Sequence, residues 1–430
     1  MTQASLSAIV SCVSGYDADA MTVTQAQQII HDFVTPINAV EQVAIRSALD
    51  RVLAVDLISS IDVPANDNSA MDGYALRSED LIPGLPQHLQ IVASVHAGQR
   101  YRGQVLSGQC VRIMTGAAMP ADCDTVIPQE VTTQASTQDN YVDIPADSVQ
   151  AGANRRRRGE DLRRGQLALP AGKLLRPADI GLLASLGVAE VAVQRRLRVA
   201  FFSTGDELRS VGEILNAGCV YDSNRYTLYG MLTRLGCDMI DMGVVRDDPV
   251  AMEATFRSAC EQADAVITSG GVSVGAADYT KQTMNKLGDM VFWKIGMRPG
   301  RPMAFGRIHS QGRGAYLFGL PGNPVAVMIS FYFFVREALL RMMGANAAPL
   351  PRLQVSTLSP IRKRPGRTEY QRGILAPDSD GQWKVRLTGA QGSGILRSMS
   401  DANCIIVLND AQADVAAGDK VEVVLFDGLL

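Results

Sequence analysis

The chain lacks a long apolar run, a close pair of cysteines and a group of histidines. Its longest mostly apolar run, residues 325–335, is too short to cross a bilayer. The seven cysteines are dispersed and form no C-x-x-C pair, which excludes zinc-finger spacing and is typical of reduced thiols in a cytosolic protein. The four histidines are isolated, so a histidine-rich metal site or a His-based catalytic triad is not expected.

The chain also lacks an excess of charge of either sign and a recognisable targeting segment. Its 430 residues carry a net charge of −3, so neither nucleic acid nor a membrane surface is expected as a main partner. No basic stretch followed by an apolar core stands at the N-terminus. We therefore expect no signal peptide and a cytoplasmic location.

The pattern of apolar residues divides the chain into segments of different character. Residues 197–345 alternate short buried strands with amphipathic helices, which predicts a mostly parallel sheet covered by helices. Residues 55–153 and 346–430 have short strands between Gly, Pro, Asp and Asn, which predicts a β-rich inserted domain and a C-terminal β-barrel or sandwich. Residues 154–196 return to mixed structure, and we expect them to form one discontinuous domain with residues 21–54. The predicted fold class is multidomain α/β plus all-β.

Two local predictions concern the N-terminal region. Apolar side chains recur at helical spacing in residues 24–34 and 47–54, which predicts two helices, the second with Ser47 as its N-cap. Residues 1–20 are polar and small, and we expect them to be frayed.

Two glycine-rich turns occur where a strand ends and a helix begins. Their sequences are SGGVSVG at 269–275 and LPGNPV at 320–325. Glycine permits tight turns, and bare N–H groups at the start of a helix attract anions. Because ligands of parallel sheets bind at the carboxyl ends of the strands, the two turns predict a pocket for a phosphorylated or oxyanionic ligand.

Acidic residues follow the same strands. Mg²⁺ prefers carboxylate and phosphate oxygens, so its candidate ligands are Glu207, Asp247 and Asp278. Each acid near these positions also has a structural alternative. Asp248 is in place to cap a helix, Asp247 precedes that cap, and Asp206 is in place to cap the turn after the first strand.

Basic residues follow the fourth strand of the same segment. Lys294, Arg298 and Arg301 are expected to neutralise anionic oxygens. Arg offers a planar fork that grips a tetrahedral oxyanion, whereas Lys acts as a point charge.

Two further segments are ambiguous on chemistry alone. Residues 64–75 are mostly polar or turn-forming and show no periodicity, which fits either a turn or a site. Residues 155–161 are a charge run, for which a solvated linker is the simpler interpretation.

Taken together, these segments resemble a known family. They are DNSAMDGYA (67–75), IMTGAAMP (113–120), RRRGEDL (156–162), STGDEL (203–208), DSNRY (222–226), TSGGVSVGAADYTK (268–281), KIGMRPGRP (294–302), LPGNPV (320–325) and QRG (371–373). The chain resembles the molybdopterin molybdenumtransferases of the bacterial MoeA type, whose eukaryotic relatives include the E domain of gephyrin. The segments span nearly the whole chain and keep the family order.

The resemblance implies an activity and an assembly. Family members insert molybdate into the dithiolene of adenylated molybdopterin and release AMP, with Mg²⁺ held by carboxylates. The family also implies a homodimer whose discontinuous domain (21–54 and 154–196) is an elongated linker and dimerisation domain. Its active cleft lies between the α/β domain of one subunit and the β-rich domain of the other. Molybdopterin adenylyltransferase and other proteins of the same pathway are the further partners that it implies.

Site residues carry over from the family by position in the motifs. The expected catalytic residues are Asp67, Thr115, Asp161, Glu207, Asp247, Asp278 and Lys294. The expected substrate-binding residues are Ser269, Gly270, Gly271, Ser273, Gly275, Arg298, Arg301, Pro302, Pro321, Gly322, Asn323, Pro324, Arg372 and Ser393, with Arg367 as the alternative to Arg372.

The chain departs from the family pattern at several positions. Arg298 and Arg301 stand where the family often has Lys, so charge is kept while geometry changes. Ala326 stands where the family often has Ser, which removes one hydroxyl that would touch an oxyanion. Ala276 and Ala277 follow Gly275 where an acidic residue is common, and nothing in the sequence explains that change.

Three rival functions fit part of the sequence. Molybdopterin adenylyltransferase shares the α/β unit, but it is usually a single domain without the segments 55–150 and 345–430. A scaffold that clusters partners would be expected to have lost site residues, which are intact here. A protein that only carries the cofactor is the third alternative.

Overall fold

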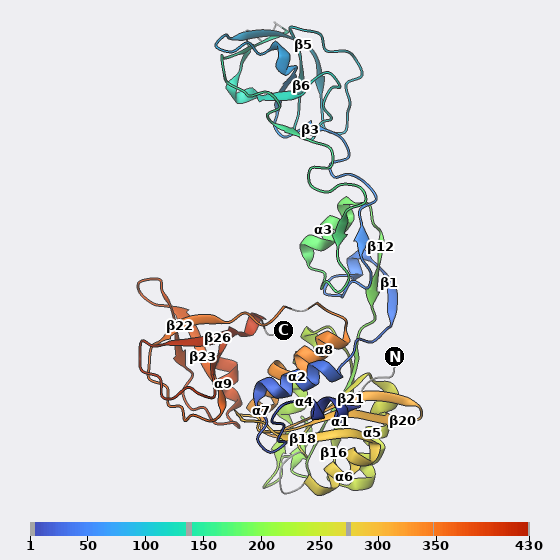
Figure 1. Cartoon of the computed structure of the whole chain (residues 1–430), viewed down its shortest axis with the longest axis vertical. Helices are drawn as coiled ribbons and strands as arrows, with labels where there is room; N and C mark the ends of the chain where they lie inside the picture. The colour runs from blue at the N-terminus through green and yellow to red at the C-terminus, as the bar shows by residue number, and fades with distance from the viewer. Residues whose placement is uncertain (1–4, 135–139, 272–276, 347, 429–430) are drawn as a thin grey trace.

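The computed structural model shows an elongated molecule with a β-rich domain at one end and two packed domains at the other (Figure 1). It describes residues 5–134, 140–271, 277–346 and 348–428. Among these residues, no helix is long and apolar enough to cross a membrane. The multidomain α/β plus all-β class predicted from the sequence is confirmed.

The α/β domain is built on a six-stranded sheet. Its spatial order is β16 (Asp238–Val245), β13 (Arg198–Thr204), β17 (Ala265–Ser269), β21 (Arg313–Leu320), β20 (Pro302–Ser310) and β18 (Gly288–Lys294). The first four strands are parallel, and β20 is antiparallel to both of its neighbours. The sheet is therefore mostly parallel, as predicted, although the sequence reading missed β20.

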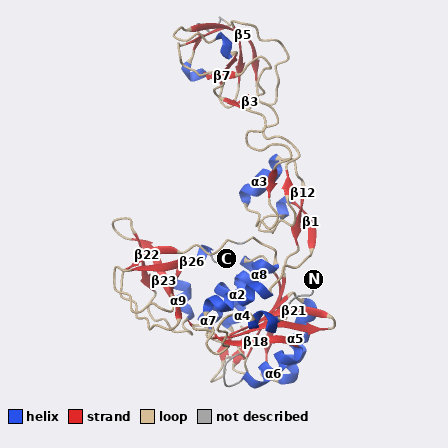
Figure 2. Cartoon of the chain, in the orientation of Figure 1, coloured by secondary structure: helices blue, strands red, loops and turns tan. Residues whose placement is uncertain are grey.

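Helices cover both faces of this sheet, as Figure 2 shows. They are α2 (Val23–Phe33), α4 (Ser223–Arg234), α5 (Pro249–Gln262), α6 (Ala277–Leu287), α7 (Pro324–Ser330), a π-helical segment (Phe331–Val335) and α8 (Arg336–Met342). Alternate residues of β13 enter different cores, because strand side chains alternate between faces. Val199 and Phe201 pack with α2, α4, α7 and α8, whereas Ala200 and Phe202 pack with α5 and α6.

The C-terminal domain is a closed five-stranded barrel. Its strands are β22 (Leu353–Thr357), β23 (Thr368–Pro377), β24 (Trp383–Leu387), β25 (Cys404–Leu408) and β26 (Lys420–Leu425), with a short helix α9 (Leu396–Asp401). Pairing of β23 with both β24 and β25 closes the ring. A short strand of the α/β domain, β19 (Met297–Arg298), adds to β23 and so ties the basic segment to the barrel.

The β-rich domain stands on a stem of paired strands. The outgoing chain forms β1 (Val40–Ala44), β2 (Leu57–Ile58) and β3 (Asn68–Ser69). The returning chain forms β10 (Arg155–Arg156), β11 (Leu167–Leu169) and β12 (Glu190–Gln194). The antiparallel pairs are β1 with β12, β2 with β11 and β3 with β10. Helix α3 (Pro177–Ser185) packs beside the stem (Figure 1).

The β-rich domain beyond the stem, hereafter the far domain, is built on a six-stranded sheet. Its order is β7 (Thr125–Pro128), β4 (Gly73–Leu76), β6 (Gln109–Ile113), β5 (Gln87–Val95), β9 (Tyr141–Ile144) and β8 (Thr133–Gln134). Strand β4 begins inside the segment 64–75, for which the sequence left a turn or a site open.

Two N-terminal predictions are wrong. Residues 47–54 do not form a helix: a 3₁₀ turn (Ile45–Ser47) leads into extended chain, and the Leu53 N–H donates to Lys173 O at 2.9 Å. Backbone partners far along the chain thus outweigh helical spacing. Residues 1–20 are not all frayed, because Ser5 caps a helix α1 (Leu6–Ser11) and Leu6 is fully buried against the core of the α/β domain.

Replacement of Leu6 by Ala is expected to lower the free energy of unfolding by about 2–4 kcal/mol, because it leaves a cavity in the core. Chemical denaturation measures this loss, with exposed Ser7→Ala as the control. Equal stability of the two variants would show that the N-terminal segment does not pack on the α/β domain.

Candidate functional site

Three turns meet at the carboxyl ends of the central parallel strands. The register places Ser203 beside Ser269 and Ser269 beside Leu320, so the segments that follow leave the sheet side by side. The Gly270 N–H donates to Leu320 O at 3.0 Å, and a Cβ added to Gly322 would lie 3.8 Å from the Cα of Gly270. The two glycine-rich turns predicted from the sequence therefore lie at one edge.

Glycine is required in the first of these turns by space as well as by conformation. Gly270 has φ +92°, and a Cβ there would lie 2.6 Å from Thr204 O. Gly271 has φ +70° and faces the hydroxyls of Thr204 and Thr280. Side chains larger than hydrogen would push the turn away from β13.

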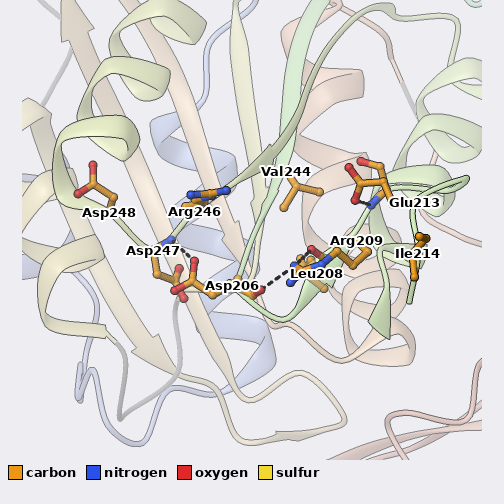
Figure 3. Close-up of a pocket in the computed structure, with 11 residues that line it drawn as sticks. Asp206, Leu208, Arg209, Glu213, Ile214, Val244, Arg246, Asp247 and Asp248 are labelled. Carbon is orange, nitrogen blue, oxygen red and sulfur yellow. Dashed lines mark hydrogen bonds between the residues drawn. The ribbon is translucent and has the colours of Figure 1, made fainter. Parts of the chain in front are cut away.

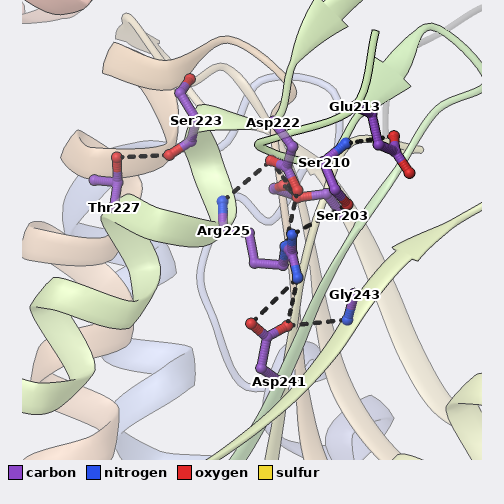
Figure 4. Close-up of polar contacts among 10 residues, drawn as sticks. Ser203, Ser210, Glu213, Asp222, Ser223, Arg225, Thr227, Asp241 and Gly243 are labelled. Atoms are coloured by element: carbon purple, nitrogen blue, oxygen red, sulfur yellow. Dashed lines mark hydrogen bonds and ion pairs between the residues drawn. The ribbon is translucent and has the colours of Figure 1, made fainter.

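A buried polar network holds the ends of the strands together, as Figure 4 shows. The Ser203 hydroxyl donates to Asp222 Oδ1 at 2.9 Å and lies 2.9 Å from the Ser269 hydroxyl. Asp222 also accepts from the Arg225 N–H at the start of α4, and Arg225 spans from Asp222 to Asp241 on β16. The DSNRY segment therefore positions the turns.

The second turn is held from two sides. The Asn224 side chain donates to Gly322 O at 2.6 Å. From the barrel, the Ser393 carbonyl accepts from the Val325 N–H at 3.0 Å. Ser393 thus contacts this turn through its backbone, and the barrel fixes where α7 begins.

An open pocket of about 830 Å³ lies beside the turn that follows β13 (Figure 3). Four acidic residues and two arginines line it: Asp206, Glu213, Asp247, Asp248, Arg209 and Arg246. Asp206 and Asp247 point toward one another in it, and the Asp247 N–H donates to Asp206 Oδ1 at 3.3 Å. Asp248 points away and caps α5 by accepting from the Ala251 N–H at 2.8 Å, which confirms the structural alternative for that residue.

The pKa of Asp247 is raised above its usual value. The first cause is loss of hydration against the pocket wall, and the second is the negative charge of Asp206 and Glu207. Glu207 is exposed and folds over Gly205, where an added Cβ would meet its carboxylate. Within the described residues, no three acidic, His or Cys side chains are grouped closely enough to hold a metal ion by themselves.

The basic segment divides between two places. Lys294 ends β18 and forms an ion pair with Asp19, while the Arg301 carbonyl accepts from the Ile295 N–H. Gly300 (φ +98°) packs so closely on α7 that an added Cβ would lie 2.8 Å from the Ser330 hydroxyl. Pro302 begins β20 opposite Lys294.

Arg298 faces the barrel and, with Arg372, lines a second cavity of about 370 Å³. Arg372 is fully buried, and its guanidinium donates to the Ser398 hydroxyl and to the carbonyls of residues 390–392. Burial, and then the charge of Arg298, lowers the pKa of Arg372 to about 10. These donors are directed at the loop before Ser393, so Arg372 supports that loop and adds positive charge to the cavity.

The remaining predicted residues lie where the stem meets the far domain. Asp67 accepts from the Arg158 N–H at 2.7 Å and so ties the 67–75 loop to the charge run. Asp161 is exposed, with its N–H bonded to Val63 O at 3.1 Å.

Thr115 reveals a residue that the sequence reading passed over. Its N–H and its hydroxyl both donate to Asp72 Oδ1, each at 2.6 Å. These two bonds lower the pKa of Asp72, which is therefore an ionised, half-buried carboxylate beside Thr115. The sequence motif contains Asp72, but its spacing to position 115 gives no sign of the contact.

Within one chain, the predicted site residues near the far domain do not meet those of the α/β domain. Figure 1 places the region of β3 far from the sheet of the α/β domain. Ser273 and Gly275 fall outside the described residues, and the same holds for the side chain of Asp278 in α6. Their predicted roles stay predictions, as do those of the other site residues.

Comparisons with known proteins agree along the chain. Matching family descriptions are "MoeA N-terminal region (domain I and II)" over residues 21–187, "Probable molybdopterin binding domain" over 200–341 and "MoeA C-terminal region (domain IV)" over 354–426. A molybdopterin molybdenumtransferase of Haemophilus influenzae is 40% identical over 393 residues, which cover 91% of this chain and 95% of the relative. The chain belongs to the MoeA family of molybdopterin molybdenumtransferases.

Further relatives extend the same result. A molybdopterin molybdenumtransferase of Nostoc sp. is 35% identical and covers 89% of this chain and 87% of its own. The crystal structure of a molybdopterin biosynthesis moeA protein from Pyrococcus horikoshii OT3 has a TM-score of 0.80 at 26% identity, covering 95% of this chain and 100% of that one.

Membership in the MoeA family makes this chain a transferase of molybdenum cofactor biosynthesis. The matches include both β-rich regions, which the rival adenylyltransferase was expected to lack. The resemblance inferred from the sequence segments is confirmed.

Replacement of Asp247 by Asn is expected to raise the melting temperature at pH 7–8. A carboxyl with a raised pKa is destabilising when ionised, so this cost is present above its folded-state pKa and disappears as the pH falls below its unfolded value. The gain should therefore shrink toward pH 3.

Asp248→Asn is the matched control for this measurement, because it removes the same charge next door and Asn caps helices about as well as Asp. A melting temperature of Asp247→Asn that is no higher than the parent's at neutral pH would contradict the assigned electrostatics.

Proposed function

We propose that the chain inserts molybdate into adenylated molybdopterin in a Mg²⁺-dependent reaction that releases AMP. The observation that carries the proposal is the contact of two glycine-rich turns with each other and with Thr204, next to the turn that lines an acidic pocket, within a family of molybdopterin molybdenumtransferases. N–H groups of the turns would bind phosphate oxygens of the adenylate, and the acidic pocket would hold the Mg²⁺ that those oxygens share.

The acidic pocket fits a divalent cation that is shared with the substrate. Asp247 and Glu207 add negative charge to one place. Loss of hydration, followed by the charges of Asp206 and Glu207, raises the pKa of Asp247. Mg²⁺ is usually held by one or two carboxylates together with substrate phosphates, so a closed cage of protein ligands is not needed. When bound, Mg²⁺ would neutralise phosphate oxygens. Asp278 is proposed as a further ligand on the family's pattern.

The basic residues would hold the oxyanion. Lys294 and Arg301 lie at the end of β18, and Arg298 and Arg372 line the cavity beside the barrel. Because molybdate and the adenylate are both anionic and repel in water, these cations would bring them together. Molybdate, or a water that it positions, would then attack the activated phosphate, and AMP would leave. No covalent bond to the protein is required.

We further propose a homodimer with a shared active site. The far domain, which carries Thr115 and Asp72, lies at the opposite end of the molecule from the α/β domain (Figure 1), so a second copy would have to supply these two residues. The stem exposes large apolar side chains suited to burial in such an interface. They are Val40, Leu49, Val55, Ile58, Leu167 and Leu174.

A cytoplasmic location is part of the proposal. All seven cysteines are free thiols in the structure, which fits a reducing compartment.

The reaction is tested by incubating the purified protein with adenylated molybdopterin and Mg²⁺, with and without molybdate. Release of AMP that depends on molybdate is the expected result. Formation of the adenylate from ATP and molybdopterin, or no consumption of the adenylate, would contradict the proposal.

The shared site is tested by complementation between two inactive variants, Asp72→Asn and Asp247→Asn. Random exchange of subunits makes half of the dimers mixed, and each mixed dimer has one intact site, so the mixture should recover about a quarter of the parent activity. If each site lies within one chain, mixed dimers contain no intact site and the mixture stays inactive.

A further inference from the structure

The N-terminal segment closes against the carboxyl end of β18. The Lys294 N–H donates to Ala18 O, and the Gly296 N–H donates to Met21 O, each at 2.7 Å. Within the segment, the Asp19 N–H donates to Asp17 Oδ1 at 2.9 Å. Backbone bonds therefore fix the position of Asp19 without using its side chain.

The carboxylate of Asp19 lies among cations. Its Oδ1 is 2.6 Å from Lys294 Nζ. The bond to Lys294 and its charge, then the charges of Arg301 and Lys281, lower the pKa of Asp19. Lys281 reaches this place from α6, with its Nζ 5.5 Å from the ring centre of Phe292 on β18.

This ion pair adds little to the free energy of unfolding. The Asp19 side chain is 72% exposed and that of Lys294 is 41% exposed, and pairs so open to water contribute little. The main effect of the pair is on Lys294, because the Asp19 carboxylate brings to its ammonium group the negative charge that an oxygen of the substrate would bring. The segment also precedes residue 21, where the MoeA family match begins.

We propose that the Asp19 carboxylate is an internal anion that occupies Lys294 and must be displaced by an anionic oxygen of the substrate. The inference rests on the proposed function, in which Lys294 binds such an oxygen. A site that is partly occupied by its own carboxylate binds its ligand more weakly, in proportion to the fraction that is free. Asp19 thus sets the concentration of anionic substrate that the enzyme needs.

The test is Asp19→Asn, which keeps the backbone bonds and removes the charge. The half-saturating concentration of either molybdate or adenylated molybdopterin should fall about two- to fivefold, the range that an exposed ion pair supports, with kcat unchanged. Titrating each substrate at saturating concentrations of the other shows which anion competes with Asp19. Calorimetric titration of molybdate and of AMP gives the same comparison without turnover.

Asp32→Asn is the matched control. Asp32 is an exposed carboxylate on α2, bonded to Gln28, so the change in net charge is the same away from β18. Its half-saturating concentrations should equal those of the parent. An effect of equal size in both variants would mean that net charge alone is responsible, and would overturn the role of Asp19.

Lys294→Ala separates the two levels of the proposal. Unchanged turnover and binding in this variant would remove Lys294 from the site, and the proposed function would lose that residue. If Lys294→Ala loses activity while Asp19→Asn changes neither half-saturating concentration, only the inference about Asp19 fails. A rise in either concentration would also overturn it, because Asp19 would then be positioning Lys294 for binding.

Discussion

The register of β13, β17 and β21 is the constraint on which the site depends. Adjacent parallel strands end level with one another, so the turns after Thr204, Ser269 and Leu320 are forced into contact. Their contact is closer than side chains would allow, because an added Cβ at Gly270 would strike Thr204 O. The polar network of Ser203, Asp222 and Arg225 then prevents the strand ends from separating.

The barrel takes part in this arrangement as a support. Arg372 holds the loop before Ser393, and the Ser393 carbonyl fixes the start of α7 at Val325. Strand β19 joins the basic segment to the same barrel. The barrel thus contacts both the second turn and the strand that carries Arg298, although neither belongs to that domain.

The sequence predicts those features that depend on local pattern. The strand–helix rhythm, the cap at Asp248 and the turns at Gly270 and Gly322 follow from spacing and residue type, and all are present in the described residues. It does not predict features set by distant partners. Residues 47–54 are not helical because their backbone bonds to the returning chain. The Thr115 hydroxyl donates to Asp72, which is more than forty residues away in the sequence. Asp19 lies in a segment that was expected to be frayed, and its partner Lys294 on β18 is too distant in sequence to be predicted.

The most direct measurement of the central claim is a crystal structure of the protein with Mg²⁺, AMP and tungstate, whose anomalous scattering locates the metal. The account predicts AMP phosphate at the turns containing Gly270 and Gly322, with tungstate held by Lys294, Arg298 or Arg301. Either ligand bound on a separate face of the molecule would contradict it.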